Sequence, residues 1–373
     1  MAAVPRFDPT EYAPESSDMD ALALDRALDL IKDRDGAVAQ LCVLRHGRTI
    51  LNRSVNCAPD ALFLVFSAGK PLVTMLVHLL AERGALSLDD PVAKHWPEYA
   101  RWHGKDAITI RHVLQHRAGV PTAARGLLGD ALTMSSWERS VRNAQRARPR
   151  WEPGAVPGYH TLTYGFILGE LVRRITGNSV LEFMDRELLA PLGMRDCFLG
   201  LPPEQWTRRV PVHAAGPADL PRSLTFNSRP VRTGVIPAAN VSSTATDLAR
   251  FYQALLNGGQ LDGVRVLRPE TIDEARRPSN HAEGELDRVL NRPVRWSQGF
   301  QLGGAKYPPG RRQPMGTLSS RRAFGHNGSN VCNAWADPDR GLVFVYLTNR
   351  LVPRAEGALH QAEVSDAVLS ACR

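Results

Sequence analysis

The chain of 373 residues has little cysteine and little lysine. Its five cysteines are an odd number, lie far apart and form neither a Cys-x-x-Cys pair nor a Cys/His cluster. A disulfide framework and a structural zinc site are therefore not expected. Arginine fills nearly every basic position, and lysine occurs only as Lys32, Lys70, Lys94, Lys105 and Lys306. A lysine in an unusual setting is therefore notable in this chain.

Long apolar runs and blocks of like charge are also missing. No stretch approaches the roughly 20 apolar residues of a transmembrane helix, and the N-terminus lacks the apolar segment of a secretory signal. The net charge is +8, but the basic residues are mixed with acidic ones. No basic block of about five or six residues occurs, which argues against nucleic-acid binding. The sequence therefore favours a reduced, cytoplasmic protein without nucleic-acid or membrane partners.

Motifs for nucleotides and for the α/β-hydrolase fold are absent as well. The chain has no phosphate loop, no dinucleotide fingerprint and no Gly-x-Ser-x-Gly elbow. His112 and His116 have the i, i+4 spacing of a helical metal site, but no third ligand or glutamate base accompanies them. We therefore expect neither a metal nor a cofactor.

The periodicity of the apolar residues predicts an α+β fold. A helix and a β-hairpin near the N-terminus and strands with a final helix near the C-terminus are expected to form one mainly antiparallel sheet flanked by helices. This sheet domain would comprise residues 19–92 and 232–373, with a mostly helical domain of residues 93–231 inserted. We expect residues 1–18 to form a flexible arm and residues 202–235 to form a long loop region. The active site is expected between the two domains.

The stretch LFLVFSAGKPLVTMLVHLLAERG places Ser67 and Lys70 three residues apart where an apolar helix begins. That spacing puts both side chains on one face, at the end of a helix that offers free N–H groups. A partly desolvated lysine can lose its proton near neutral pH and activate a serine, which arginine cannot do. The alternative is a helix-capping serine beside a solvated lysine. The apolar character of the following helix favours the catalytic interpretation.

The residues around this pair resemble a known superfamily. The segment LFLVFSAGKPLVTMLVHLLAERGALSLDDPVAKHWPEY resembles the nucleophile region of serine β-lactamases and penicillin-binding proteins, which carries Ser-x-x-Lys. It is most similar to the class C β-lactamase-like esterases, of the family VIII carboxylesterase type. Three further blocks follow in family order, at residues 108–121, 157–177 and 324–350. The resemblance extends over about residues 38–350 and implies the class C β-lactamase-like fold.

The resemblance also implies roles for individual residues. Ser67 would be the nucleophile, and Lys70 and Tyr159 would share the role of general base, with Tyr159 passing a proton to the leaving group. The backbone N–H groups of Ser67 and Ser329 would form the oxyanion hole. His326 would line the pocket and hydrogen-bond the tyrosine or the substrate. The remaining residues expected to shape or support the substrate site are Gly328, Asn330, Asn333, Trp335 and His160.

Two departures from the β-lactamase pattern favour esters as substrates. The family's Tyr-x-Asn is here Tyr159-His160-Thr161, so the asparagine that contacts the acyl amide of β-lactams is missing. The Lys-Thr-Gly block is replaced by His326-Asn327-Gly328, which removes the charged group beside the β-lactam carboxylate. A His-x-Gly sequence at this place is typical of the esterase branch. Activity as a β-lactamase or D-aminopeptidase is correspondingly less favoured.

The expected reaction is hydrolysis of a small-molecule carboxylic ester through a Ser67 acyl-enzyme. The same acyl-enzyme would serve a biosynthetic acyltransferase or amide synthase with an amine or alcohol acceptor, and the sequence does not separate the two. A catalytically inactive binding protein on the same scaffold is a third alternative. The presence of Ser67, Lys70 and Tyr159 together argues against it.

Overall fold

The computed structural model describes residues 6–123, 126–307 and 312–373. Its central feature is a six-stranded sheet in which every pair of neighbours is antiparallel. The N-terminal hairpin joins the C-terminal strands through the pairing of β1 with β14, so the expected mainly antiparallel sheet is confirmed. The domain boundaries stay a prediction. In order across the sheet the strands are β11 (Gln301–Leu302), β12 (Phe324–Gly328), β13 (Cys332–Asp337), β14 (Leu342–Thr348), β1 (Ala39–Arg45) and β2 (Arg48–Val55).

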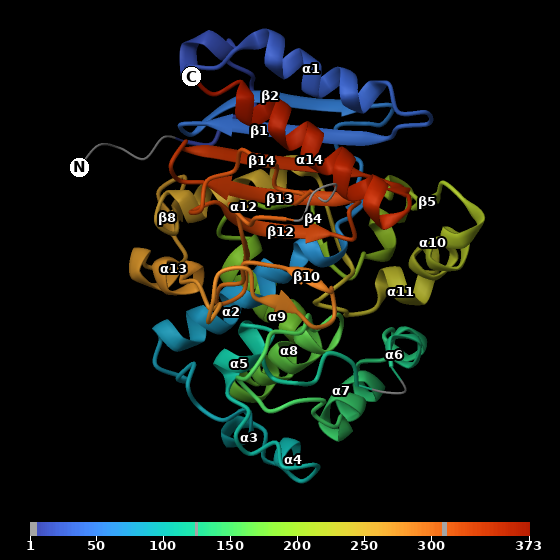
Figure 1. Cartoon of the computed structure of the whole chain (residues 1–373), viewed down its shortest axis with the longest axis vertical. Helices are drawn as coiled ribbons and strands as arrows, with labels where there is room; N and C mark the ends of the chain where they lie inside the picture. Colours follow the sequence, from blue (N-terminus) through green and yellow to red (C-terminus); the bar gives the residue numbers. More distant parts are fainter. Residues whose placement is uncertain (1–5, 124–125, 308–311) are drawn as a thin grey trace.

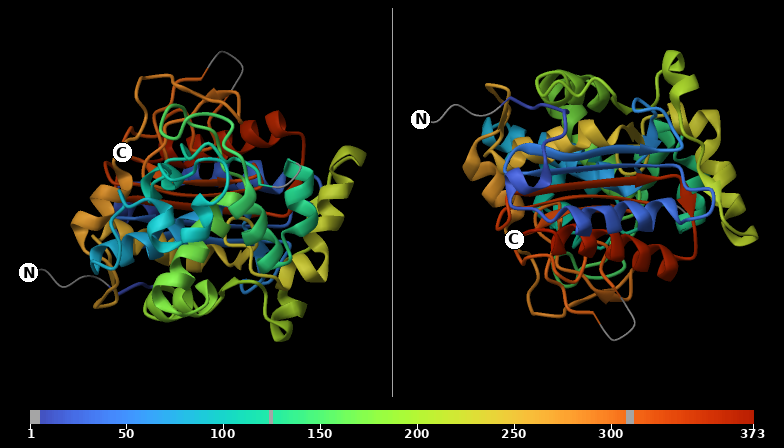
Figure 2. Two further views of the ribbon diagram at one scale, coloured as in Figure 1. Left: turned by 90° about the horizontal axis from the view of Figure 1, so that it is seen from below. Right: turned by 90° about the horizontal axis from the view of Figure 1, so that it is seen from above.

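Helices cover both faces of this sheet (Figures 1 and 2). On one face lie α1 (Ala21–Lys32) and α14 (Arg354–Ser370), whose apolar side chains pack with one face of the strands. On the other lie α2 (Lys70–Glu82) and α12 (Ala245–Leu256), with α8 (Thr163–Thr176) packed on α2. Double coverage explains why β14, with the sequence LVFVYLT, is buried at every position instead of at alternate ones.

Close backbone approaches position α2 beneath the sheet. A Cβ atom added to Gly69, just before the helix, would lie 2.9 Å from Val241 Cβ. A Cβ atom on Gly165 of α8 would lie 2.4 Å from the backbone nitrogen of Ala238. Only glycine permits these approaches, and they bring the start of α2 next to the segment around residue 238. The helix ends as expected, with Gly84 at φ +72° just beyond it.

The residues that connect these helices and strands form further short elements. The sequence predicts a long loop at residues 202–235, but this segment contains two 3₁₀ helices, two short α-helices and a short strand. Each of these four helices has a proline in its first turn, where proline is tolerated. The short helices of the chain are α3 (Val92–His95), α4 (Pro97–Ala100), α5 (Ile110–Leu114), α6 (Leu127–Thr133), α7 (Trp137–Arg146), α9 (Val180–Met184), α10 (Leu220–Asn227), α11 (Arg229–Thr233) and α13 (Pro269–Arg276). The short strands are β3 (Phe63–Leu64), β4 (Cys197–Leu199), β5 (His213–Ala214), β6 (Val241–Ser243), β7 (Gln260–Leu261), β8 (Val264–Arg265), β9 (Leu286–Asp287), β10 (Arg292–Pro293) and β15 (Arg350–Leu351).

The N-terminal arm was expected to be flexible, but its described part is attached to the sheet. The backbone nitrogen of Tyr12 donates to the carbonyl oxygen of Thr49 over 2.9 Å. Glu11 accepts a 2.6 Å hydrogen bond from the backbone nitrogen of Asn52. Proline and acidic residues suggested a loose segment, but edge strand β2 offers unpaired backbone groups that the arm satisfies. Residues 1–5 of the predicted arm lie outside the described residues.

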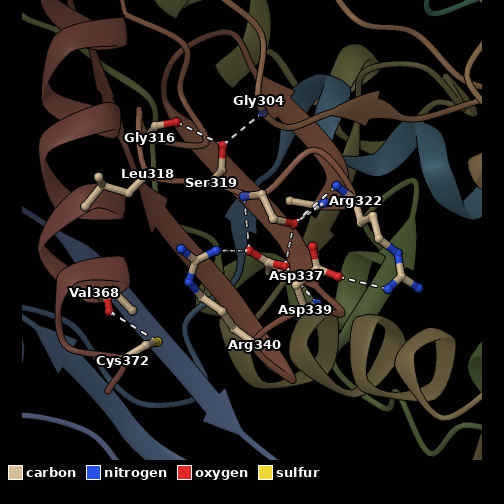
Figure 3. Close-up of polar contacts among 12 residues, drawn as sticks. Gly304, Gly316, Leu318, Ser319, Arg322, Asp337, Asp339, Arg340, Val368 and Cys372 are labelled. Carbon is tan, nitrogen blue, oxygen red and sulfur yellow. Dashed lines mark hydrogen bonds and ion pairs between the residues drawn. The ribbon is translucent and has the colours of Figure 1, made fainter.

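Figure 3 shows how the segment before β12 is fastened to the end of β13. The Asp337 carboxylate is fully buried and accepts a 2.7 Å hydrogen bond from the Ser320 hydroxyl. Arg340 donates to its other oxygen over 2.7 Å. Ser319 donates to the carbonyl of Gly316 over 2.9 Å. A buried carboxylate is stable only when it is paired in this way, so these contacts hold the segment firmly against the sheet. Within the three described ranges, no helix is long and apolar enough to cross a membrane.

Two leucines of α1 provide a test of the packing against the sheet. Leu24 is 1% exposed, whereas Leu22 on the same helix is 74% exposed. We expect Leu24→Ala to lower the free energy of unfolding by about 2–5 kcal/mol, because it removes buried methyl groups and leaves a cavity. The matched Leu22→Ala variant should change it by less than about 0.5 kcal/mol. Urea unfolding followed by circular dichroism measures both, and equal effects would contradict the packing described.

Candidate functional site

Ser67 lies on a sharp turn immediately before α2. The 3₁₀ turn Phe66–Gly69 carries it, and α2 begins at Lys70. Phe66 has a φ of +50°, a left-handed conformation that is rare for a large residue and costs about 1–3 kcal/mol. Burial of the Phe66 ring, which contacts Phe226 edge-on with ring centroids 4.9 Å apart, offsets this strain. The turn leaves Ser67 partly exposed while its neighbours are buried.

The side chain of Lys70 is completely buried beside Ser67. Its Nζ lies 3.1 Å from Ser67 Oγ and donates to the backbone carbonyls of Thr161 at 2.8 Å and Ala238 at 3.0 Å. No carboxylate among the described residues forms a salt bridge with it. Burial without a counter-charge holds the pKa of Lys70 well below its usual range. The amine can therefore be neutral and accept a proton from the serine.

Tyr159 stands on the other side of this amine. Lys70 Nζ lies 4.9 Å from the centroid of the Tyr159 ring, and the ring stacks on Trp296 with an interplanar angle of 4°. Burial raises the pKa of the Tyr159 phenol, while a hydrogen bond with the Ser67 side chain opposes the rise. The guanidinium groups of Arg292 and Arg354 also lower this pKa. The phenol thus lies within reach of Ser67 and near positive charge.

Asp287 holds the tyrosine in place and was not foreseen from the sequence. The fully buried carboxylate accepts from the backbone nitrogen of Tyr159 and from Trp296 Nε1, both over 3.1 Å. It also accepts from the backbone nitrogens of Val289 and Leu290, both over 2.9 Å. One acidic residue among many, in the two-residue strand β9, carries no local signal. Its role depends on a contact between segments more than a hundred residues apart in sequence.

His326 on β12 lies in the same site with one nitrogen unpartnered. Its Nδ1 contacts the carbonyl oxygen of Asn327 over 2.8 Å, so Nδ1 carries the proton. Its Nε2 is buried and has no hydrogen-bond partner within the described residues. Burial, together with the charge of Lys70, lowers the pKa of His326 to about 3. The imidazole is therefore neutral and presents an acceptor.

His160 was expected among the substrate-binding residues, but the structure places it behind the tyrosine. It is fully buried, with Nδ1 2.7 Å from the carbonyl oxygen of Gly158 and Nε2 accepting from the backbone nitrogen of Val120. Its backbone nitrogen donates to His116 Nδ1 over 3.1 Å. His116 in turn contacts the rings of Tyr159 and other aromatic residues. Both histidines thus support the site from within the protein.

Gly328, at the end of β12, brings the next loop against the turn of Ser67. A Cβ atom on this glycine would lie 2.1 Å from the carbonyl oxygen of Val65, so no other residue fits without displacement. Ser329 and Asn330 follow, both with φ of +56°, and the backbone nitrogen of Asn330 donates to Asn327 Oδ1 over 2.9 Å. This geometry sets the Ser329 loop beside Ser67. The oxyanion role of the two backbone N–H groups stays a prediction.

Trp335 and Asn333 are not brought to the site, which corrects the sequence-based expectation. Side chains alternate across a strand, and on β13 these two residues point to the face covered by α1 and α14. The Trp335 ring is fully buried and stacks on Phe344. Asn333 Nδ2 donates to the carbonyl oxygen of Pro314 over 2.6 Å. The sequence indicates the strand that borders the site but not which face of that strand meets it.

A cavity of about 590 Å³ opens at Ser67. It unites Ser67 and Tyr159 with His326, Ser329 and Asn330, whereas Lys70 lies buried behind the serine. Part of the wall is apolar and part is cationic. Its other described lining residues are Leu127, Thr161, Arg222, Val289, Leu290, Arg292, Gln301, Tyr307, Arg312, Asn327, Arg354, Ala355, Ala358 and Leu359. Within the described ranges, no group of three or more His, Cys, Asp or Glu side chains is arranged to hold a metal ion.

Comparisons with known proteins agree with this geometry. The family model described as Beta-lactamase matches residues 24–368. The chain is 32% identical over 328 residues to "Esterase/beta-lactamase LipL" of Mycobacterium tuberculosis, covering 80% of this chain and 71% of the relative. It is 28% identical to "Esterase EstB" of Burkholderia gladioli, covering 95% and 96%. The crystal structure of a family VIII carboxylesterase superposes with a TM-score of 0.78 at 25% identity, covering 95% of this chain and 98% of that one.

The family match extends over nearly the whole chain and includes every element that positions Ser67, Lys70, Tyr159 and His326. The full-length similarity to esterases fits the replacement of the Lys-Thr-Gly block by His326-Asn327-Gly328. The chain belongs to the beta-lactamase family, in its branch of serine β-lactamase-like esterases.

Proposed function

We propose that the protein hydrolyses carboxylic esters through an acyl-enzyme on Ser67. The observation that carries this proposal is the Lys70 amine, which is fully buried, lacks an acidic partner among the described residues and lies 3.1 Å from Ser67 Oγ. A buried lysine kept from ionising is suited to accept the serine proton. The esterase names of the relatives and the His-x-Gly sequence support esters as the substrate class.

The steps of this mechanism use the described groups. Ser67 Oγ attacks the ester carbonyl as its proton passes to Lys70, and the N–H groups of Ser67 and Ser329 stabilise the oxyanion. The C–O bond then breaks, Tyr159 donates its proton to the departing alkoxide, and Lys70 returns a proton to the phenolate. Water attacks the acyl-enzyme with the same groups in reverse. The unpartnered Nε2 of His326 accepts a hydrogen bond from the water or the alcohol.

The nucleophile is tested directly by mass spectrometry. Brief mixing with 4-nitrophenyl butyrate should give a transient mass increase of one butyryl group in the wild type and none in Ser67→Ala. Lys70→Arg should lower the acylation rate by about a hundredfold or more, since arginine stays protonated and cannot act as base. Full esterase activity in Ser67→Ala would refute the proposal.

Adding a panel of amines to the same reaction tests whether an amine, instead of water, accepts the acyl group. Release of butyrate as the main product supports hydrolysis. An amide as the main product, formed as the adduct decays faster, would instead establish the acyltransferase that the sequence left open.

The pH dependence of the reaction follows from the state of Lys70. The base is active when unprotonated, so kcat/KM should rise with pH through the pKa of Lys70 and then level off. Because burial lowers that pKa, the plateau should begin well below pH 10.5. His326, with a pKa of about 3, is already neutral above pH 5, so its titration causes no change in kcat/KM near pH 6.5. Measurement of kcat/KM from pH 5 to 10 for wild type and His326→Gln tests this. A change in kcat/KM near pH 6.5 that is present in the wild type and lost in the variant would contradict the expectation.

Gly328 offers a test of how the nucleophile turn is supported. Gly328→Ala should slow labelling of Ser67 by a fluorophosphonate about tenfold to a hundredfold, because the added methyl group displaces the turn at Val65. Gly216→Ala is the matched control, as Gly216 has an extended backbone at φ −149° with nothing within 4 Å of the added atom. Near-UV circular dichroism confirms that both variants fold. Equal labelling rates in the two variants would refute this support.

A further inference from the structure

The cavity at Ser67 has an unusual charge balance. Four of its described lining residues are arginines, and none is aspartate or glutamate. Guanidinium groups are planar forks that bind carboxylates and phosphates in pairs of hydrogen bonds. A cluster of them repels itself unless anions are nearby. The four are Arg222, Arg292, Arg312 and Arg354.

The acidic side chains around the cavity neutralise only part of this cluster. Asp219 pairs with Arg222 over 3.2 Å. Glu356, two residues after Arg354, pairs with Arg34 over 3.3 Å instead. Within the described part of the chain, neither Arg292 nor Arg354 forms a salt bridge with a carboxylate. Arg292 additionally has a buried Nε without a hydrogen-bond partner among these residues.

The nearest buried carboxylate, Asp287, is already occupied. It faces Arg292 as a backbone partner in the β9–β10 pair, but its oxygens accept from three backbone nitrogens and from Trp296 Nε1. It therefore serves Tyr159 and does not project into the cavity as a counter-ion; it is not a lining residue. The guanidinium groups of Arg292 and Arg354 remain available to a ligand.

The start of α14 adds to the positive character of this wall. Arg354 is the first residue of this 17-residue helix, and Ala355, Ala358 and Leu359 of the same helix also line the cavity. The free N–H groups and the dipole of a helix favour anions at this end. Asn330 Nδ2 donates to the carbonyl oxygen of Arg354 over 2.8 Å, which ties the helix start to the loop of Ser329.

The charged wall borders Tyr159, the proposed proton donor to the leaving oxygen. Arg292 and Arg354 line the same cavity as Tyr159. Arg292 is paired across β9–β10 with Asp287, which accepts from the Tyr159 backbone nitrogen. Both guanidinium groups also lower the pKa of the Tyr159 phenol. Burial lowers the pKa of Arg222, and Arg354 lowers it further, which brings Arg222 into the same electrostatic group. A negative charge on the departing alcohol would be attracted to these guanidinium groups.

We propose that the enzyme selects esters whose alcohol part carries an anionic substituent, a carboxylate or a phosphate, which Arg292 and Arg354 bind. This inference rests on the proposed esterase function. It assigns a specificity role to two arginines of the cavity wall. The apolar residues Leu127, Val289 and Leu290 contact the uncharged remainder of the substrate.

Matched chromogenic esters test the charge preference. The acidic ester is 3-carboxy-4-nitrophenyl butyrate, and the neutral one is its methyl ester. After correction for uncatalysed hydrolysis, wild-type kcat/KM should be about tenfold or more higher for the acidic ester, since a charge-assisted hydrogen bond contributes at least this factor. The preference should shrink between 20 and 500 mM salt, because exposed charges are screened.

Variants assign the preference to particular residues. Arg292→Gln and Arg354→Gln should each lower the ratio of acidic to neutral kcat/KM about tenfold. Arg142→Gln, which removes an exposed charge on α7, is the matched control and should leave the ratio unchanged. An unchanged ratio in both cavity variants would overturn the inference.

Two further substrates locate the charge and identify its chemistry. A 4-nitrophenyl hydrogen glutarate ester carries the carboxylate on the acyl side, and a preference for it alone would refute the alcohol-side assignment. The butyrate ester of 3-hydroxyphenyl phosphate, hydrolysed faster than the carboxylate ester, would identify phosphate as the anion. Ser67-dependent hydrolysis of the neutral ester without any charge preference would overturn this inference and leave the esterase proposal intact. Activity independent of Ser67 would refute the esterase proposal itself.

Discussion

The site depends on one lysine amino group that is buried without a carboxylate. Lys70 Nζ contacts a side-chain oxygen and two backbone carbonyls, which solvate the amine but do not neutralise a charge. Those contacts join the Ser67 turn, the loop after Tyr159 and the segment at Ala238. The glycines at 69 and 165 permit the close packing that puts these three segments together. The environment that makes the lysine a base is therefore also the one that places the nucleophile and the phenol.

Backbone strain occurs on both segments that meet at the nucleophile. Phe66 precedes Ser67 with a positive φ, and Ser329 and Asn330 on the facing loop share this feature. Such conformations cost about 1–3 kcal/mol each and persist only where surrounding contacts enforce them. The ring of Phe66 is buried, and Asn330 is held through its backbone and its side chain. Packing at some distance from the reacting atoms thus maintains their geometry.

The parts of this site that could be predicted share a local sequence signal. Helical spacing places Ser67 and Lys70 on one face. Runs of β-forming residues predict strands β12 to β14. Asp287 has no such signal, because its partners are backbone nitrogens of distant segments. Trp335 was assigned to the site although strand alternation sends it to the opposite face. Which face of a strand meets the site depends on how the whole sheet is covered, and a pattern read along one strand does not contain that information.

The pairing of β1 with β14 has a consequence for how the chain reaches this state. Ala39 is opposite Thr348, so the sheet joins residues that lie far apart in the sequence. During synthesis β1 emerges well before β14, so this apolar strand lacks its partner until the later segment has been made. Contacts of such large sequence separation slow folding and prolong the exposure of an unpaired strand. The nucleophile turn packs against β12, which also lies far away in the sequence, so the site depends on contacts of the same long range.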